Sequence, residues 1–206
     1  MTDAYSPVPE LNLLKEFSDG PGEEEFSHGF EFYEYNRPSA GLVEWLCLEG
    51  REEEVRGHLD QLAPFARASG SGSFYALWHC DDRTDFATLP VIRFGDEGDL
   101  DIIEGLRNLF RLLAIDDEWF ASWNEEREAD PDEEHSTGHE AYVAWLQETF
   151  GLTPPTEPER DEILESGRKK YGARFVDWLE EFGSRKIDFD SWRKEWRLLS
   201  KSATRS

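Results

Sequence analysis

The stretch between Ala68 and Ala114 constrains the fold of this chain more than any other part of it. A loop of small residues leads into an aromatic run at 73–79, and an acidic turn separates that run from a second apolar run at 90–94. Short apolar runs bounded by turn residues predict β-strands. Apolar residues within 105–114 recur every three or four positions, which is the spacing of an amphipathic helix. The order therefore predicts a hairpin or meander followed by a helix.

The flanking segments add further expected elements. Apolar spacing predicts helices over 9–17, 51–68, 139–150, 159–170, 171–182 and 186–200, and strands are expected over 29–36 and 100–103. Pro64 lies inside the second of these helices and is expected to kink it or to end its regular part. Ser136 or Thr137 is the expected N-cap of the helix that Gly151 terminates.

Together these segments predict an α+β fold. We expect a small, twisted, largely antiparallel sheet built from 29–36, 73–80, 90–95 and 100–103. Helices 51–68 and 105–114 are expected to cover one face, and the C-terminal helices to pack outside them. The expected organisation is one α+β domain over residues 1–152, which includes an acidic segment at 116–136, and a helical extension over 153–206 packed on it.

Composition narrows the class of protein. An aromatic content of 14%, with eight tryptophans, is too high for a disordered chain. The two cysteines, Cys47 and Cys80, form no disulfide framework, which fits a reducing compartment. The N-terminal residues lack the basic and apolar regions of a signal peptide, and no run approaches the roughly 18 apolar residues of a membrane span. These features predict a soluble, cytoplasmic protein.

Charge points to a class of partner. The net charge is −24, with −11 over residues 1–60, −3 over 61–115, −15 over 116–165 and +5 over 166–206. Nucleic acids and anionic membranes are disfavoured as partners, because binding them requires clustered Lys and Arg. A basic protein partner is favoured, because a field of this sign accelerates its approach. The alternative is that the acidity only maintains solubility.

Three pieces of the central stretch resemble the SUKH superfamily. The first piece is Gly70-Ser71-Gly72, which leads into the first aromatic strand. The second, Leu89 to Gly98, is similar to the family's strand and acid-Glu-Gly turn. The third, Ile103 to Ala114, is similar to the helix that ends its motif. The similarity covers about a quarter of the chain well and the C-terminal helices loosely. The acidic segment at 116–136 and the long C-terminal tail depart from the compact pattern of the family.

The resemblance implies a scaffold that acts by surface recognition. Many SUKH proteins are bacterial immunity proteins that neutralise the toxins of neighbouring cells, so the expected partner is a cognate toxin, most simply a basic nuclease-type domain. A regulatory or scaffold protein of the same type is the first alternative, and a hydrolase using paired carboxylates is the second. Since the chain has no phosphate-binding loop, nucleophile elbow or metal-ligand set, we expect no enzyme activity and no cofactor.

The acidic segment holds the expected toxin-binding residues. Large aromatics among acids are typical of an exposed anchor patch, in which an aromatic residue holds the partner and the acids steer it. The residues are Trp119, Trp123, Glu125, Glu126 and Glu128. The alternative is that the tryptophans pin this segment to the core.

Other candidate sites have simpler interpretations. His135 and His139 would share a metal on a continuous helix, but a loop and helix cap lie between them and no third ligand is evident, so no metal is expected. The acids at 96–104 do not match the order of an EF-hand loop. His79 and Cys80 are neighbours on an expected strand, where their side chains face opposite sides.

Overall fold

The sheet is a five-stranded antiparallel meander. The computed structural model describes residues 4–22, 24–36, 40–96, 98–117 and 134–181. The strands lie side by side in chain order, each paired with the next along the sequence. They are β1 (Glu31–Phe32), β2 (Leu62–Arg67), β3 (Phe74–Trp78), β4 (Pro90–Phe94) and β5 (Leu100–Glu104). This arrangement confirms the predicted α+β class, although β1 is much shorter than expected.

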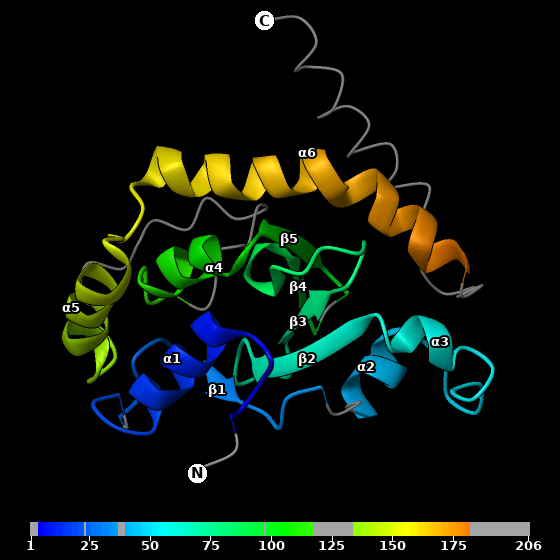
Figure 1. Cartoon of the computed structure of the whole chain (residues 1–206), viewed down its shortest axis with the longest axis horizontal. Helices are drawn as coiled ribbons and strands as arrows, with labels where there is room; N and C mark the ends of the chain where they lie inside the picture. The colour runs from blue at the N-terminus through cyan, green and yellow to red at the C-terminus, as the bar shows by residue number, and fades with distance from the viewer. Residues whose placement is uncertain (1–3, 23, 37–39, 97, 118–133, 182–206) are drawn as a thin grey trace, which may run out of the picture.

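Helices cover both faces of the sheet (Figure 1). The helices are α1 (Pro9–Ser18), α2 (Ala40–Trp45), α3 (Arg56–Leu59), the 3₁₀ helix η1 (Phe86–Thr88), α4 (Leu106–Leu113), α5 (His139–Phe150) and α6 (Glu157–Glu181). Apolar residues of α1, α4 and α5 share one core with Tyr75, Leu77 and Val91. Those of α2, α3 and most of α6 share a second core with Trp78 and Phe94.

The central strands alternate between these two cores. All five residues of β3 are buried, and so are all five of β4. Because successive side chains of a strand point to opposite faces, Phe74 and Trp78 reach the core under α6, whereas Tyr75 reaches the other core. Phe74 stacks on its cross-strand partner Phe94 with ring centroids 4.8 Å apart. A sheet buried on both faces explains why these strands are continuous apolar runs.

The prediction of a helix over 51–68 is wrong. Only Arg56–Leu59 is helical, and Leu62–Arg67 is strand β2. The apolar residues in this segment fit a helical stripe, but they also fit a strand whose two faces are both covered, as β2 is. Pro64 adjoins a register shift in the pairing with β3, a position where a strand tolerates proline. Consequently α3 and α4 lie on opposite faces, not on one.

The two helices predicted over 159–170 and 171–182 form one continuous helix, α6, which crosses the top of Figure 1. It packs directly against β5 and contributes Phe175 and Leu179 to the second core. At Gly167 the helix approaches β5 so closely that a Cβ atom would lie 1.9 Å from the carbonyl oxygen of Ile102. The helix predicted over 186–200 lies outside the described residues.

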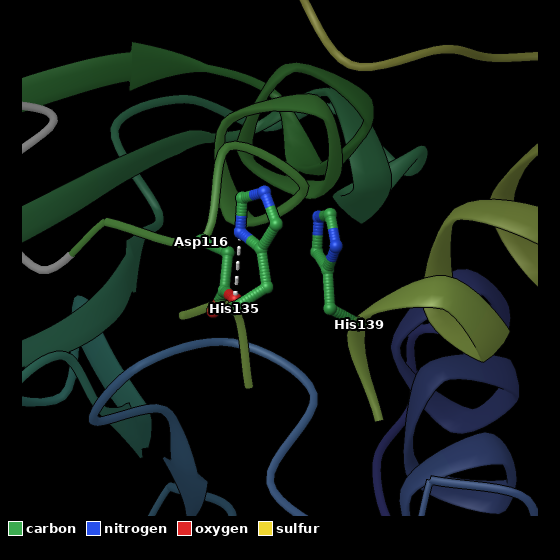
Figure 2. A group of neighbouring side chains, drawn as sticks. All are labelled: Asp116, His135 and His139. Carbon is green, nitrogen blue, oxygen red and sulfur yellow. Dashed lines mark ion pairs between the residues drawn. The ribbon is translucent and has the colours of Figure 1, made fainter. Parts of the chain in front are cut away.

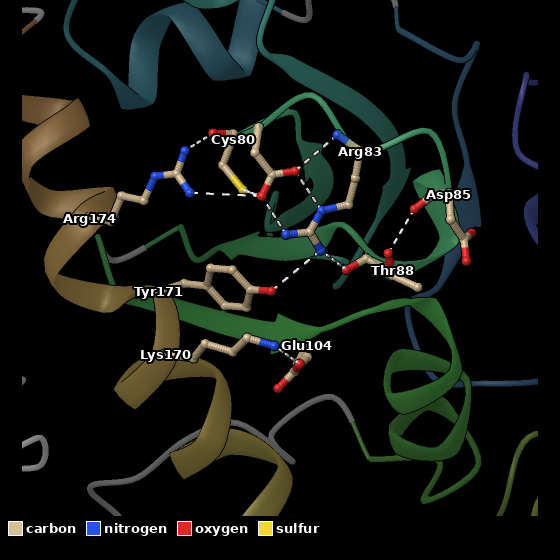
Figure 3. A network of polar contacts seen from close by, with 9 residues as sticks. Cys80, Arg83, Asp85, Thr88, Glu104, Lys170, Tyr171 and Arg174 are labelled. Atoms are coloured by element: carbon tan, nitrogen blue, oxygen red, sulfur yellow. Dashed lines mark hydrogen bonds and ion pairs between the residues drawn. The ribbon is translucent and has the colours of Figure 1, made fainter.

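Polar contacts also fasten α6 to the sheet (Figure 3). Arg174 donates to the carbonyl oxygen of Cys80, and Lys170 pairs with Glu104 at the end of β5. Deeper inside, Asp101 of β5 accepts hydrogen bonds from Arg93 of β4, at 3.2 Å, and from Arg168 of α6; all three side chains are buried. This arrangement makes the position of α6 depend on specific charged partners as well as on apolar packing.

Among the described helices, none combines the length and the apolar composition needed to cross a membrane.

Candidate functional site at the base of the acidic segment

The five predicted toxin-binding residues, Trp119 to Glu128, lie within 118–133, outside the described residues. The structure does describe both ends of this segment, at Asp116–Asp117 and at Glu134–Ser136. The candidate site is therefore built from the residues that hold these two ends. Their arrangement decides how the acidic segment is joined to the folded core.

Asp116 is the central residue of this base. It follows α4 directly, with its amide donating to the carbonyl oxygen of Leu113 at 3.1 Å, and its φ of 61° lies in the left-handed region. Aspartate tolerates this region better than most residues, because its short polar side chain can bond locally. The turn directs the carboxylate inward, where the side chain is 0% exposed.

The Asp116 carboxylate joins three pieces of chain. Its Oδ2 accepts the backbone N–H of Ser136 at 2.6 Å, and its Oδ1 accepts the hydroxyl of Ser136 at 2.7 Å. Oδ1 also accepts the backbone N–H of His28 at 2.8 Å. Charge-assisted hydrogen bonds of this kind are about twice as strong as neutral ones. Residues 20 positions apart are thus fixed at one point, so the two described ends of the acidic segment are held side by side on the core.

Two histidines lie beside this carboxylate (Figure 2). His135 Nδ1 is 3.3 Å from Asp116 Oδ2, and His139 Nε2 is 3.0 Å from the carbonyl oxygen of Ala114. The two imidazole rings stack with centroids 4.1 Å apart and an interplanar angle of 20°. The sequence pattern brings the two histidines together but misses Asp116, because no local signal connects a residue after α4 to one that precedes α5.

The start of α5 is anchored to the N-terminal part of the chain. Gly138 is the N-cap, in place of the predicted Ser136 or Thr137, and Ser136 instead bonds to Asp116. The Gly138 amide donates to the carbonyl oxygen of Glu25 at 2.8 Å, and a Cβ atom here would lie 3.1 Å from that oxygen. One turn later, buried Tyr142 donates its hydroxyl hydrogen to the carbonyl oxygen of Phe110 at 2.9 Å. The base is therefore anchored to α4, to α5 and to the N-terminal part of the chain.

The His79–Cys80 pair follows strand β3 and is poorly suited to nucleophilic catalysis. Burial raises the pKa of the Cys80 thiol, and the adjacent Asp81 carboxylate raises that pKa further. Burial lowers the pKa of His79, whose ring packs edge-on against Phe86. A protonated thiol beside a neutral imidazole lacks the thiolate character that a catalytic cysteine requires.

The described acids at 96–104 bond to polar groups of the protein itself. Asp96 accepts a hydrogen bond from Ser73, whereas Asp99 and Asp101 both accept from Arg93. Glu104 pairs with Lys170 on α6. Three of these four carboxylates already pair with a guanidinium or ammonium group, so a structural role is favoured over calcium binding.

A cavity of about 510 Å³ lies where η1, the start of α4 and α6 meet. Its cationic side chains are each paired with a carboxylate: Arg83 with Asp81, Arg107 with Glu10, and Lys170 with Glu104. An anionic ligand would have to displace these ion pairs. The arrangement favours a role in holding α6 against the sheet.

Neither a protein-family model, nor a curated protein, nor a solved structure matches this chain.

Asp116→Asn is expected to lower the free energy of unfolding by about 2 kcal/mol, because the amide leaves a buried N–H or hydroxyl without its acceptor. Asparagine suits the left-handed backbone as well as aspartate does, so the substitution isolates the lost hydrogen bonds. Urea unfolding measures the effect. The exposed Asp82, in the turn after β3, is the control; equal losses for Asp116→Asn and Asp82→Asn would contradict the assigned role.

Proposed function

We propose that this protein is an immunity protein, which binds a basic toxin domain through the acidic segment at 116–136 and blocks the toxin's active site. The segment contains ten acidic residues and one basic residue, a net charge of −9. Nuclease toxins need cationic grooves to hold phosphates, so an acidic cover competes directly with their substrate.

The observation that carries this proposal is the closed base of the segment. Asp116 and Ser136 are both buried and hold the two ends of the segment together at one point of the core. Closing a loop in advance removes part of the entropy that binding would otherwise cost. A highly charged segment mounted in this way is suited to protein recognition.

The sequence resemblance to SUKH proteins supports the same proposal. Its glycine-containing pieces lie at positions where backbone geometry demands glycine: Gly72 precedes β3 with φ of 122°, and Gly98 lies between β4 and β5 with φ of 87°. The third piece corresponds to the end of β5 and α4. Since α4 leads directly to Asp116, the resemblance and the candidate site adjoin each other along the chain.

Substitutions in the segment are expected to separate two kinetic effects. Trp119→Ala or Trp123→Ala should speed dissociation from the toxin by about 30-fold, the size typical of an aromatic hot spot. Glu125→Lys combined with Glu126→Lys should slow association by about tenfold at low salt, and by much less at high salt, because steering is screened. Surface plasmon resonance with the protein encoded beside this chain's gene measures both rates.

The matched control places the same charge change elsewhere. Asp161→Lys combined with Glu162→Lys alters two consecutive exposed acids on α6. If this control slows association as much as the double substitution at Glu125 and Glu126 does, the association rate depends on the net charge of the protein and not on a specific site. If the wild-type protein does not bind the toxin, the proposed immunity function is wrong. If it binds but none of these substitutions changes either rate, only the choice of residues is wrong.

A further inference from the structure

We infer that Asp116, His135 and His139 form a binding site for a transition-metal ion, for which Zn²⁺ is the best-suited ligand. One potential ligand atom from each of the three side chains lies within 4.8 Å of the other two, in the part of the chain that the structure describes. Two imidazoles and a carboxylate are a common set of protein ligands for Zn²⁺. This inference is independent of toxin binding.

The distances are close to those of a bound ion. With Zn–N and Zn–O bonds of about 2.0–2.2 Å, neighbouring ligand atoms of a tetrahedral site lie about 3.3–3.5 Å apart. His135 Nδ1 and Asp116 Oδ2 are already 3.3 Å apart. The nitrogen of His139 has to move closer, by about 1.5 Å at the 4.8 Å limit.

The imidazole rings must turn to bind the metal. A coordinated ion lies in the plane of each ring, whereas the two rings here are stacked with an interplanar angle of 20° (Figure 2). Rotation about the bond between Cβ and the ring has a broad energy minimum, so the stack can open at low cost. The His139 nitrogen that binds the ion gives its lone pair, and the other ring nitrogen remains able to donate a hydrogen bond.

The surroundings already resemble the outer shell of a metal site. The carboxylate of Asp116 is oriented by Ser136 and by the His28 amide, as metal-binding carboxylates usually are by neighbouring donors. The carbonyl oxygen of Ala114 lies within hydrogen-bonding distance of the His139 ring. His135 is 63% exposed, which gives an ion access from solvent and leaves a fourth coordination position for water. The net charge of −24 raises the local concentration of cations.

Zinc titration in competition with a chromophoric chelator tests the site. The wild-type protein is expected to take up one Zn²⁺ ion more tightly than its surface carboxylates do. His135→Ala and His139→Ala should each weaken that binding by at least about tenfold, and the double variant should abolish it. His58→Ala is the matched control, because His58 lies on α3, whose residues belong to the other core; it should bind like the wild type. Circular dichroism establishes that each variant is folded.

A second readout reports the ligands directly. Co²⁺ replacing Zn²⁺ should give a visible absorption spectrum typical of nitrogen and oxygen ligands, and His135→Ala should change that spectrum. The inference is overturned if the wild-type protein binds no Zn²⁺ ion tightly. It is also overturned if the double variant binds Zn²⁺ as tightly as the wild type does. In either case the stacked histidines serve only to pack the base of the segment.

Discussion

Gly167→Ala is expected to lower the free energy of unfolding by about 3 kcal/mol, the upper end of the range for overpacking substitutions. Alanine normally stabilises a helix relative to glycine. Here the added methyl group would lie 1.9 Å from the carbonyl oxygen of Ile102, a backbone atom of β5 that cannot rotate away. The long helix α6 would have to move off the sheet and open the core around Phe175. Urea unfolding followed by tryptophan fluorescence measures the loss.

Gly57→Ala is the matched control for this prediction. Gly57 lies in the short helix α3, and a Cβ atom built on it meets nothing within 4 Å. Its free energy of unfolding should stay the same or rise by up to about 1 kcal/mol. If Gly167→Ala proves as harmless as Gly57→Ala, α6 does not approach β5 as closely as described.

Asp101→Asn is expected to cost about 3 kcal/mol, the lower end of the range for breaking a buried ion pair, because it removes a buried carboxylate from two buried guanidinium groups while Arg93 keeps its ion pair with Asp99. The substitution preserves the shape of the side chain but removes the one negative charge that both Arg93 and Arg168 contact. All three groups are buried between α6 and the sheet, where water cannot replace the lost partner. Thermal or urea unfolding measures the change at neutral pH.

Two further variants test whether the loss of stability at Asp101 comes from the burial of its charged partners. Glu54→Gln breaks an exposed ion pair with Arg51 and should hardly change the unfolding midpoint, because exposed pairs contribute little. Replacing the buried residues together, as Arg93→Met, Asp101→Leu and Arg168→Met, should recover most of the loss. A triple variant as unstable as Asp101→Asn would contradict this explanation, because the loss could then not come from buried charge that has lost its partner.

Helix α5 and strands β3, β4 and β5 could be predicted from the sequence because local signals specify them. The boundaries of α5 follow from its apolar spacing and from Gly151, which adopts φ of 67° at its C-terminal end. Strand β4 is a short apolar run that begins at a proline and ends before a glycine-containing turn. Each of these elements is specified by residues that lie within a few positions of one another in the sequence.

Strand β2 and the continuity of α6 needed the tertiary structure. The apolar pattern of 51–68 fits a helix and a doubly buried strand equally well, and only pairing with β3 on one side and β1 on the other selects the strand. Helix α6 extends through 167–172 because one side of that stretch is buried against the sheet, including Gly167, where helix and strand nearly touch. Local propensity alone does not contain this information.

The candidate site shows the same division. The acidity of the segment at 116–136 and the pair of histidines at its end are visible in the sequence. That Asp116 binds Ser136, 20 residues away, and meets both histidines depends on how α4 and α5 pack around Tyr142. The sequence by itself determined the charge, the central strands and the chemistry available, because these follow from residue type and local order. The tertiary structure decided which of those groups meet, because contacts between distant residues arise only when the two cores bury their apolar faces together.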